Sequence, residues 1–307
     1  MLQEVSNNGF VWIDIGNPSR ADMQAIGARF PFHELNLADC LSKIQIPKID
    51  RYADHIFVIL HFPMGEESGI PKSTQLAAFM GRGYMVTVHQ AEMRPVDGIF
   101  EQCKESDKSR QELMGKSAGY LFHSIVDALT DELLNVVRKV VGNIDDVEDV
   151  VFDEKANAAK EISYIRRQVT SLRRISVPLR RTLTEITAKD IQRFSDEDLT
   201  LYFDDVKDHI DKAIDTLDES KETIEIYKDT DNMHAIEKSN KILAVLTIIF
   251  TLSMPASIMS SFYGMNVDLP IIDPSAIGGY GTFVVIVLAS GLIALGMFLY
   301  FRRIMWI

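Results

Sequence analysis

The sequence predicts a soluble α+β part, arranged as an α/β/α sandwich, followed by a long helical stalk and two C-terminal transmembrane helices. Three observations carry this prediction. Runs rich in β-branched and aromatic residues alternate with helical spacing over residues 1–115. Patterns of helical period then fill residues 116–262, and two charge-free segments lie near the C-terminal end. A chain of 307 residues is long enough for one domain plus membrane segments.

Residues 1–115 are predicted as a mixed α/β domain. Runs typical of strands cover residues 10–15, 55–62, 74–80 and 84–89. The last two flank Gly81-Arg82-Gly83, which predicts a hairpin turn. Helical spacing covers residues 19–30 and 33–42, with Ser19 or Asp22 as the cap of the first helix.

Residues 116–194 are predicted as long antiparallel helices, over 118–156 and 159–186. The second helix carries arginines in pairs seven residues apart, and these pairs are Arg166-Arg167, Arg173-Arg174 and Arg180-Arg181. Such spacing places them on one stripe. We interpret the stripe as a face that is solvated or ion-paired with the acidic end of the preceding helix, contact with anionic lipid being the weaker alternative. Pro178 predicts a kink or break.

Residues 195–262 are predicted as a stalk helix that continues into the first membrane span. Ser195 suits the N-cap, and three acids follow it at the positive end of the helix dipole. A helix from Asp196 to Phe262 would be about 100 Å long, which cannot pack within one compact domain, so we expect partners from other subunits. Residues 190–240 hold 16 acids against 6 bases, most of the formal net charge of −12.

Two segments without charge, residues 242–262 and 280–301, each exceed the roughly 20 residues that cross a bilayer. Lysines precede the first span and Arg302-Arg303 follow the second, in a basic tail of residues 302–307, whereas the loop 263–279 has neither Lys nor Arg. The positive-inside rule therefore predicts a multi-pass protein of the cell membrane with both termini in the cytoplasm. We expect no signal peptide, and Cys40 and Cys103 to be free thiols.

One face of the first span is polar at its ends and bulky and apolar in its middle. Its members follow at spacings of three or four and are Asn240, Leu243, Leu246 or Thr247, Phe250, Met254, Ser257 and Ser261. Several symmetric copies of this face would make a narrow pore that can gate by dewetting. On a single helix, the Ser and Asn side chains would serve only as interhelical hydrogen-bonding groups. The acids of the stalk have two interpretations as well: a solvated coiled-coil surface, or ligands for divalent cations.

The stretch SSFYGMNVDLP, residues 260–270, closes this span, and LTIIFTLSMP leads into it. With Gly264-Met265-Asn266 intact and a second span ending in YFRRIMWI, the chain resembles the CorA-type magnesium channel family. Further similar segments, in the family's order, are PKIDRYADHIFVILHF, HSIVDALTDEL and LTLYFDDVKDHI. The resemblance covers nearly the whole chain, more loosely before residue 45.

The resemblance implies a funnel-shaped homopentamer in the lipid bilayer, with the long helix of each subunit lining a central pore. Gly264, Met265 and Asn266 would form the selectivity filter, where amide oxygens accept hydrogen bonds from the water shell of Mg²⁺ without stripping it. Further pore positions implied by the family are the polar rings Asp229 and Asn240, the hydrophobic gate Leu243, Leu246 and Met254, and the polar ring Ser257. Two departures stand out: Ser257 is more often Thr, and Phe250 replaces a smaller residue.

In the family, Mg²⁺ held between neighbouring soluble domains keeps the channel closed. The matching positions here are Asp205 on the stalk and Asp127 in HSIVDAL. Partner carboxylates are expected after VILHFPMGEES, at Glu66 and Glu67. Mg²⁺ is thus both the expected cargo and the expected regulator.

The function predicted is conduction of hydrated Mg²⁺ into the cell, with Co²⁺ or Ni²⁺ as surrogates. One alternative is Zn²⁺ transport, as in a related branch, and a second is a membrane-anchored coiled-coil scaffold without transport. The glycines form no phosphate-binding pattern, and no nucleophile–base group is evident, so we expect no enzyme. Nucleic acid is not an expected partner.

Overall fold

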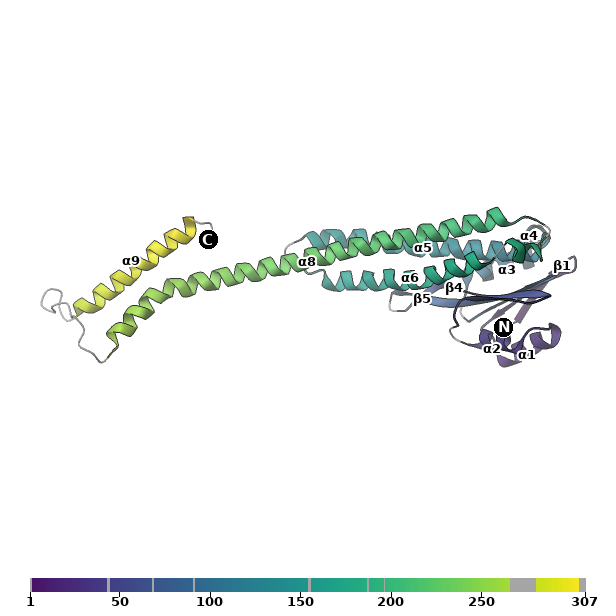
Figure 1. Cartoon of the computed structure of the whole chain (residues 1–307), viewed down its shortest axis with the longest axis horizontal. Coiled ribbons are helices and arrows are strands. Elements are labelled where there is room, and N and C mark those ends of the chain that lie inside the picture. The colour runs from purple at the N-terminus through teal and green to yellow at the C-terminus, as the bar shows by residue number, and fades with distance from the viewer. Residues whose placement is uncertain are drawn as a thin grey trace. The chain divides into compact units, whose positions relative to one another are not determined.

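The computed structural model describes residues 2–42, 45–67, 69–90, 92–153, 156–186, 188–195, 197–265 and 280–303 (Figure 1). For residues 66, 67, 188, 189 and 282 it describes the backbone alone. The chain divides into two compact units, residues 1–229 and 230–307. The domain boundaries that the sequence suggests are finer than this division and stay predictions.

The first unit is built on a six-stranded mixed sheet in the order β1-β2-β6-β5-β4-β3. Its strands are β1 (Leu2–Asn7), β2 (Phe10–Gly16), β3 (Lys48–Arg51), β4 (His55–Glu67), β5 (Ile70–Gly81) and β6 (Tyr84–His89). Only β2 and β6 among these neighbours run parallel; the other pairs are antiparallel. The hairpin expected at Gly81-Arg82-Gly83 joins β5 and β6.

Helices cover both faces of the sheet, because its central strands are apolar on both sides. In β4, Ile56, Val58 and Leu60 belong to one core, and Phe57 and Ile59 belong to the other. The smaller core lies under α1 (Arg20–Arg29) and α2 (Glu34–Leu41). The larger core lies under α3 (Arg94–Glu105), α4 (Asp107–Met114), α5 (Ala118–Phe152) and α6 (Ala159–Glu185), which gives the predicted α/β/α layers (Figure 1).

Several local features decide where these helices begin and end. Ser19 caps α1 through a capping box with Asp22, as its position predicts. α6 passes through Pro178 as one element, so the expected break does not occur. The edge strands β1 and β3 and the helices α3 and α4 were not predicted from the sequence. The β1–β2 turn at Asn8-Gly9, both with positive φ, is a hairpin signal that could have revealed β1.

The long helix α8 (Thr200–Tyr263) follows the short helix α7 (Ala188–Gln192) and begins four residues later than expected. Ser195 does not cap α8. Its hydroxyl accepts a hydrogen bond from the backbone N–H of Glu197 and lies 2.9 Å from the hydroxyl of Ser117, the N-cap of α5. The first half of α8 completes the larger core with side chains such as Val206, Ile210 and Leu217, all essentially buried.

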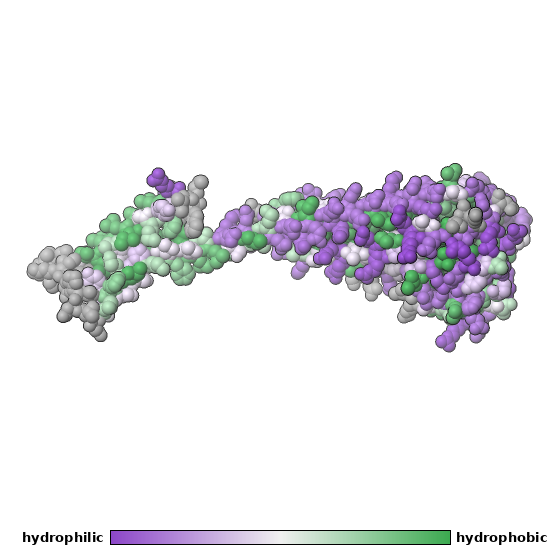
Figure 2. All heavy atoms as spheres, in the orientation of Figure 1, coloured by the Kyte–Doolittle hydropathy of each residue, from purple (hydrophilic) through white to green (hydrophobic). Residues whose placement is uncertain are grey.

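The second unit consists of the rest of α8 and of α9 (Gly281–Arg303). Both helices are long and apolar enough to cross a membrane, and few of their span residues are buried. Figure 2 shows α9 and the C-terminal half of α8 mainly in green, whereas the first unit is mainly purple. A surface this apolar is typical of helices that face lipid or other membrane helices.

Candidate metal centre and pore-facing helix

Three metal-binding side chains meet between α5 and α8 in the first unit. Asp127 projects from α5, and Asp205 and His209 project from α8 one turn apart. One ligand atom from each lies within 4.8 Å of the others. Asp127 and His209 are half-buried and Asp205 is exposed, so an ion can reach the cluster from solvent. Nδ1 of His209 is buried without a hydrogen-bond partner in the part of the chain that the structure describes.

The electrostatics of this cluster favour a bound cation. Burial raises the pKa of the Asp127 carboxyl, and the charges of Asp131 and Asp205 raise it further, while His123 and His209 lower it. Burial also lowers the pKa of His123, one turn away on α5, so its neutral form is favoured. Two carboxylates that repel one another at a partly desolvated position are stabilised by a divalent ion. The donors present fit such an ion.

The structure brings together the two carboxylates that the sequence suggests for regulation, Asp127 and Asp205, and adds His209. The Asp-x-x-x-His spacing of Asp205 and His209 on one helix is the signal that could have found the histidine. Glu66 and Glu67 close strand β4, and their side chains lie outside the described residues. Their role stays a prediction.

The hairpin that carries Glu66 and Glu67 packs on α6. The carbonyl of Gly69 accepts hydrogen bonds from the Tyr164 hydroxyl at 2.9 Å and from Nε2 of Gln168 at 2.7 Å. The carbonyl of Pro71 accepts one from the hydroxyl of Ser171. These contacts fix the tip of the hairpin on α6, whereas the Asp127 cluster is built from α5 and α8.

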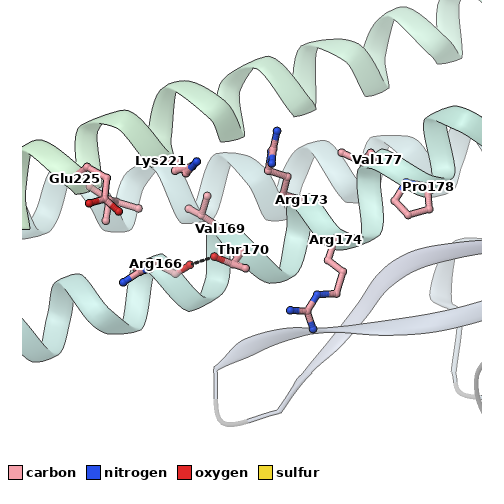
Figure 3. Close-up of a pocket in the computed structure, with 10 residues that line it drawn as sticks. Arg166, Val169, Thr170, Arg173, Arg174, Val177, Pro178, Lys221 and Glu225 are labelled. Carbon is pink, nitrogen blue, oxygen red and sulfur yellow. Dashed lines mark hydrogen bonds between the residues drawn. The ribbon is translucent and has the colours of Figure 1, made fainter.

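Two arginines of the α6 stripe are ion-paired with α8, a partner that the sequence did not suggest. Arg173 pairs with Asp218, and Arg180 pairs with Asp211. α6 and α8 run antiparallel here. Moving seven residues forward along α6, from Arg173 to Arg180, therefore corresponds to moving seven residues back along α8, from Asp218 to Asp211. Figure 3 shows Arg173 directed towards α8 and Arg174 towards the sheet. Both side chains line a cavity of about 440 Å³. This ladder accounts for part of the stalk's acid.

The face of α8 proposed to line a pore is exposed within the second unit. Phe250 is 67% exposed, and Leu243, Leu246 and Met254 are exposed as well. Asn240, Ser257 and Ser261 are also exposed, and so is Asp229, the last residue of the first unit.

The opposite face of α8 is the one that meets α9. The least exposed residues of this part of α8 are Ala244, Ile248, Thr251, Leu252, Pro255 and Met259. Small side chains of both helices, including Ala256, Ser260, Gly291 and Ala294, line a groove between them. At 3.6 residues per turn, Leu246, Phe250 and Ser257 lie on roughly the other side of the helix. Nothing in the described part of the second unit covers that side.

The expected filter begins where α8 ends. The backbone N–H of Gly264 donates to the carbonyl of Ser260 at 2.9 Å, and that of Met265 donates to the carbonyl of Phe262 at 3.3 Å. Gly264 does not have the positive φ that would require glycine. A Cβ at this position would instead lie 3.1 Å from the carbonyl oxygen of Ser260, a tight contact. Asn266 lies outside the described residues.

The first unit is a mixed α/β/α fold with a carboxylate–histidine cluster, and its helix α8 continues into the first of two helices long enough to span a membrane. Together these features define a membrane protein that handles divalent cations. The chain matches the model of the CorA-like Mg²⁺ transporter proteins over residues 7–303 and belongs to that family. It is therefore a divalent-cation transporter, not an enzyme. The scaffold alternative is wrong.

Relatives named for the transport of different metal ions have similar sequence identity to this chain. The chain is 26% identical over 300 residues to the cobalt/magnesium transport protein CorA of Thermotoga maritima, covering 96% of this chain and 83% of that protein. It is 21% identical over 220 residues to the zinc transport protein ZntB of Photorhabdus laumondii, covering 72% and 65%. The complete structure of the CorA magnesium transporter from Methanocaldococcus jannaschii has a TM-score of 0.79 at 18% identity, covering 100% of this chain and 95% of that chain. This likeness shows the fold.

Proposed function

We propose that the chain forms a homopentameric channel of the cell membrane that conducts hydrated Mg²⁺ into the cytoplasm. The observation that carries the proposal is the exposed stripe on α8, opposite the face that packs on α9. Its polar ends and bulky apolar middle are unsuited to lipid alone, because lipid gives no partner to Asn240 or Ser257. Copies of the stripe around a symmetry axis would give these side chains a water-filled pore.

In this pore, Leu243, Leu246, Phe250 and Met254 form a hydrophobic constriction, and Ser257 and Ser261 line the wider part beyond it. Phe250 is the bulkiest side chain of the stripe and therefore sets the narrowest ring. A ring of this kind closes by expelling water and opens when the helices move apart slightly. Asn240 and Asp229 supply polar rings on the cytoplasmic side.

Gly264, Met265 and Asn266 form the outer entrance. Five amide oxygens hold an ion through its water shell, and the absence of charge keeps the affinity low enough for release. Both termini face the cytoplasm, because the lysines before the first span and Arg302-Arg303 after the second are retained there.

Cytoplasmic Mg²⁺ closes the pore by binding at the carboxylates of Asp127 and Asp205, with Glu66 and Glu67 of a neighbouring subunit completing an oxygen shell. The stalk helices carry a surplus of acid, and bound cations reduce their mutual repulsion. When Mg²⁺ leaves, this repulsion separates the stalks and relaxes the constriction.

The proposal is tested by Mg²⁺ flux into liposomes that contain the purified protein. The wild type should take up Mg²⁺ at low internal Mg²⁺, and Asn266→Ala should lose most of the selectivity for Mg²⁺ over monovalent ions. Ser253→Ala is the matched control, a polar change in the same span at a residue that is not on the stripe. Equal selectivity in all three proteins, or a mass measurement that gives a monomer, would contradict the proposal.

One observation favours Zn²⁺ or Co²⁺ as an alternative cargo or effector: the imidazole of His209 in the cluster. Imidazole suits first-row transition ions better than Mg²⁺, which prefers oxygen. His209→Gln should therefore leave inhibition by internal Mg²⁺ nearly unchanged and weaken that by Co²⁺ at least tenfold. Flux of Zn²⁺ faster than Mg²⁺ in the wild type would favour zinc transport.

A further inference from the structure

A second group of metal-binding side chains lies at the sheet, far along the chain from the stalk residues. Asp14 is on β2, His89 ends the neighbouring parallel strand β6, and Asp97 is in the first turn of α3. Because β2 and β6 are parallel, their carboxyl ends meet at one edge of the sheet, and α3 begins there. One ligand atom of each residue lies within 4.8 Å of the others.

Nε2 of His89 faces both carboxylates, and its contact with Asp14 is a long hydrogen bond. Nε2 of His89 lies 3.3 Å from Oδ2 of Asp14 and 3.9 Å from Oδ1 of Asp97. The first distance is longer than is usual for an N–H···O bond, and a single N–H cannot serve both oxygens well. In a tetrahedral site with bonds of about 2.0 Å, ligand atoms lie about 3.3 Å apart. The His89–Asp14 separation matches this spacing, and the His89–Asp97 separation is longer, within the range that a small shift of the partly exposed Asp97 side chain would close.

A buried outer shell fixes the first ligand. The Thr87 hydroxyl donates to Oδ1 of Asp14 at 2.5 Å, and Nε1 of Trp12 donates to the Thr87 oxygen at 3.0 Å. Trp12, Asp14 and Thr87 are all buried. One oxygen of Asp14 is thereby occupied, and the other is directed to His89. Hydrogen bonds that orient a ligand in this way are typical of metal sites.

Two further features complete the site. The His89 imidazole packs over Gly16, where a Cβ would lie 3.4 Å from the ring. The Asp97 side chain is 43% exposed, which leaves a path for an ion, whereas His89 is 3% exposed. The charge of a divalent cation would compensate both carboxylates.

We infer that Asp14, His89 and Asp97 form a binding site for a divalent first-row transition ion such as Zn²⁺ or Co²⁺ in the soluble unit. Imidazole with two carboxylates selects this class over Mg²⁺, which needs an all-oxygen shell. The site is separate from the Asp127 cluster and from the pore, and it does not depend on the proposed Mg²⁺ conduction. Water fills the remaining position of the ion.

The test is a Co²⁺ titration of the full-length protein in detergent, after chelator treatment, followed by visible absorption. All variants carry Asp205→Asn, so that the stalk cluster contributes little. Asp97→Asn should lower the Co²⁺ affinity of one site per chain. Changes to residues that only orient a ligand cost roughly 10–100-fold in metal affinity, and the loss of a ligand should cost at least as much. Glu92→Gln is the matched control, because it removes a nearby exposed carboxylate that is not one of the three ligands.

His89→Gln gives an independent readout, since it should remove the imidazole contribution to the Co²⁺ spectrum. Zn²⁺ should raise the Tm of Glu92→Gln but not of Asp97→Asn, because only an ion that binds the folded state stabilises it. Asp97 is partly exposed, so its variant keeps the fold, which the Tm without metal checks. The inference would be overturned if Asp97→Asn, His89→Gln and Glu92→Gln all kept the Co²⁺ affinity of the Asp205→Asn parent. It would also be overturned if all three lost affinity to the same extent.

Discussion

Arg173 of α6 donates to Asp218 of α8 with an Nε–Oδ1 distance of 2.5 Å, and the same pairing recurs one heptad along at Arg180 and Asp211. Both helices therefore carry complementary charges with a period of seven. The ladder ties the stalk helix to the α/β/α layers at a surface where packing alone leaves a cavity. Its side chains are about half exposed, so it sets register more than it adds stability.

Asp218→Asn should lower the free energy of unfolding by less than about 1 kcal/mol, because exposed ion pairs are weak and screened by salt. The measurement is the Tm of the full-length protein in detergent at low and at high salt. The difference from wild type should shrink at high salt. Asp215→Asn, an exposed acid of α8 without an ion pair in the described chain, should show no such dependence. A large loss at both salt concentrations would mean that packing was disturbed.

Asp127 predicts a pH dependence of the metal-free protein. Its pKa is raised in the folded state by burial, so the folded protein holds this proton more tightly than the unfolded chain does. The stability it contributes is present below the ordinary Asp pKa and is lost as pH rises through the raised value. Asp127→Asn should remove this loss and stabilise the metal-free protein at neutral pH.

The check is Tm in chelator from about pH 4 to about pH 8, followed by Mg²⁺ addition at neutral pH. Mg²⁺ should raise the Tm of the wild type and of Glu132→Gln, a half-buried acid five residues further along α5 and outside the cluster, but not that of Asp127→Asn. An identical pH profile in wild type and Asp127→Asn would show that this carboxyl is not the group concerned.

Asp205→Ala should make transport less sensitive to internal Mg²⁺, raising the half-inhibiting concentration at least tenfold, because it removes the exposed ligand of the cluster. Flux is measured in liposomes loaded with graded Mg²⁺. Asp208→Ala is a matched change on the next turn of α8, outside the cluster, and should behave as wild type. Unchanged inhibition in Asp205→Ala would rule out this residue as the sensor.

The pore face of α8 can be mapped by thiol labelling, because the native cysteines are silent. Cys40 and Cys103 are buried free thiols, and burial raises the pKa of Cys103 to about 11. Phe250→Cys should react with a small charged thiol reagent at low Mg²⁺ and slow at least tenfold at high Mg²⁺. Its neighbour Ile249→Cys, on a different side of the helix, should stay unreactive in both conditions. If Ile249→Cys reacted and Phe250→Cys did not, a different face of α8 would line the pore.

Much of the fold follows from local patterns. The apolar runs at residues 55–62, 74–80 and 84–89 form central strands, because a strand buried on both faces must be apolar throughout. The strands β1 and β3 could not be predicted in this way, because edge strands are short and partly polar. The short helices α3 and α4 were missed as well, although Pro95 in the first turn of α3 is a helix-start signal that could have revealed it.

The candidate sites divide in the same way. Asp127 and Asp205 were predicted because the resemblance links two segments far apart in sequence, and His209 joins them only when α5 lies against α8. The Asp14, His89 and Asp97 group had no sequence signal, because its residues come from three elements that meet at one sheet edge. The pairing of Arg173 and Arg180 with α8 was not predicted, because charge spacing gives a period along one helix and does not identify the neighbouring helix.

The sequence by itself determined the central strands of the sheet, the two membrane spans and the α8 stripe with residues three and four apart. Each of these is a pattern of side chains within a single helix or strand, so no knowledge of its neighbours is needed. Only the tertiary structure decided which helix faces which: that α6 pairs with α8, and that the stripe of Phe250 lies away from α9. Periodicity defines the face an element presents, whereas its partner depends on a chain path that brings distant residues together.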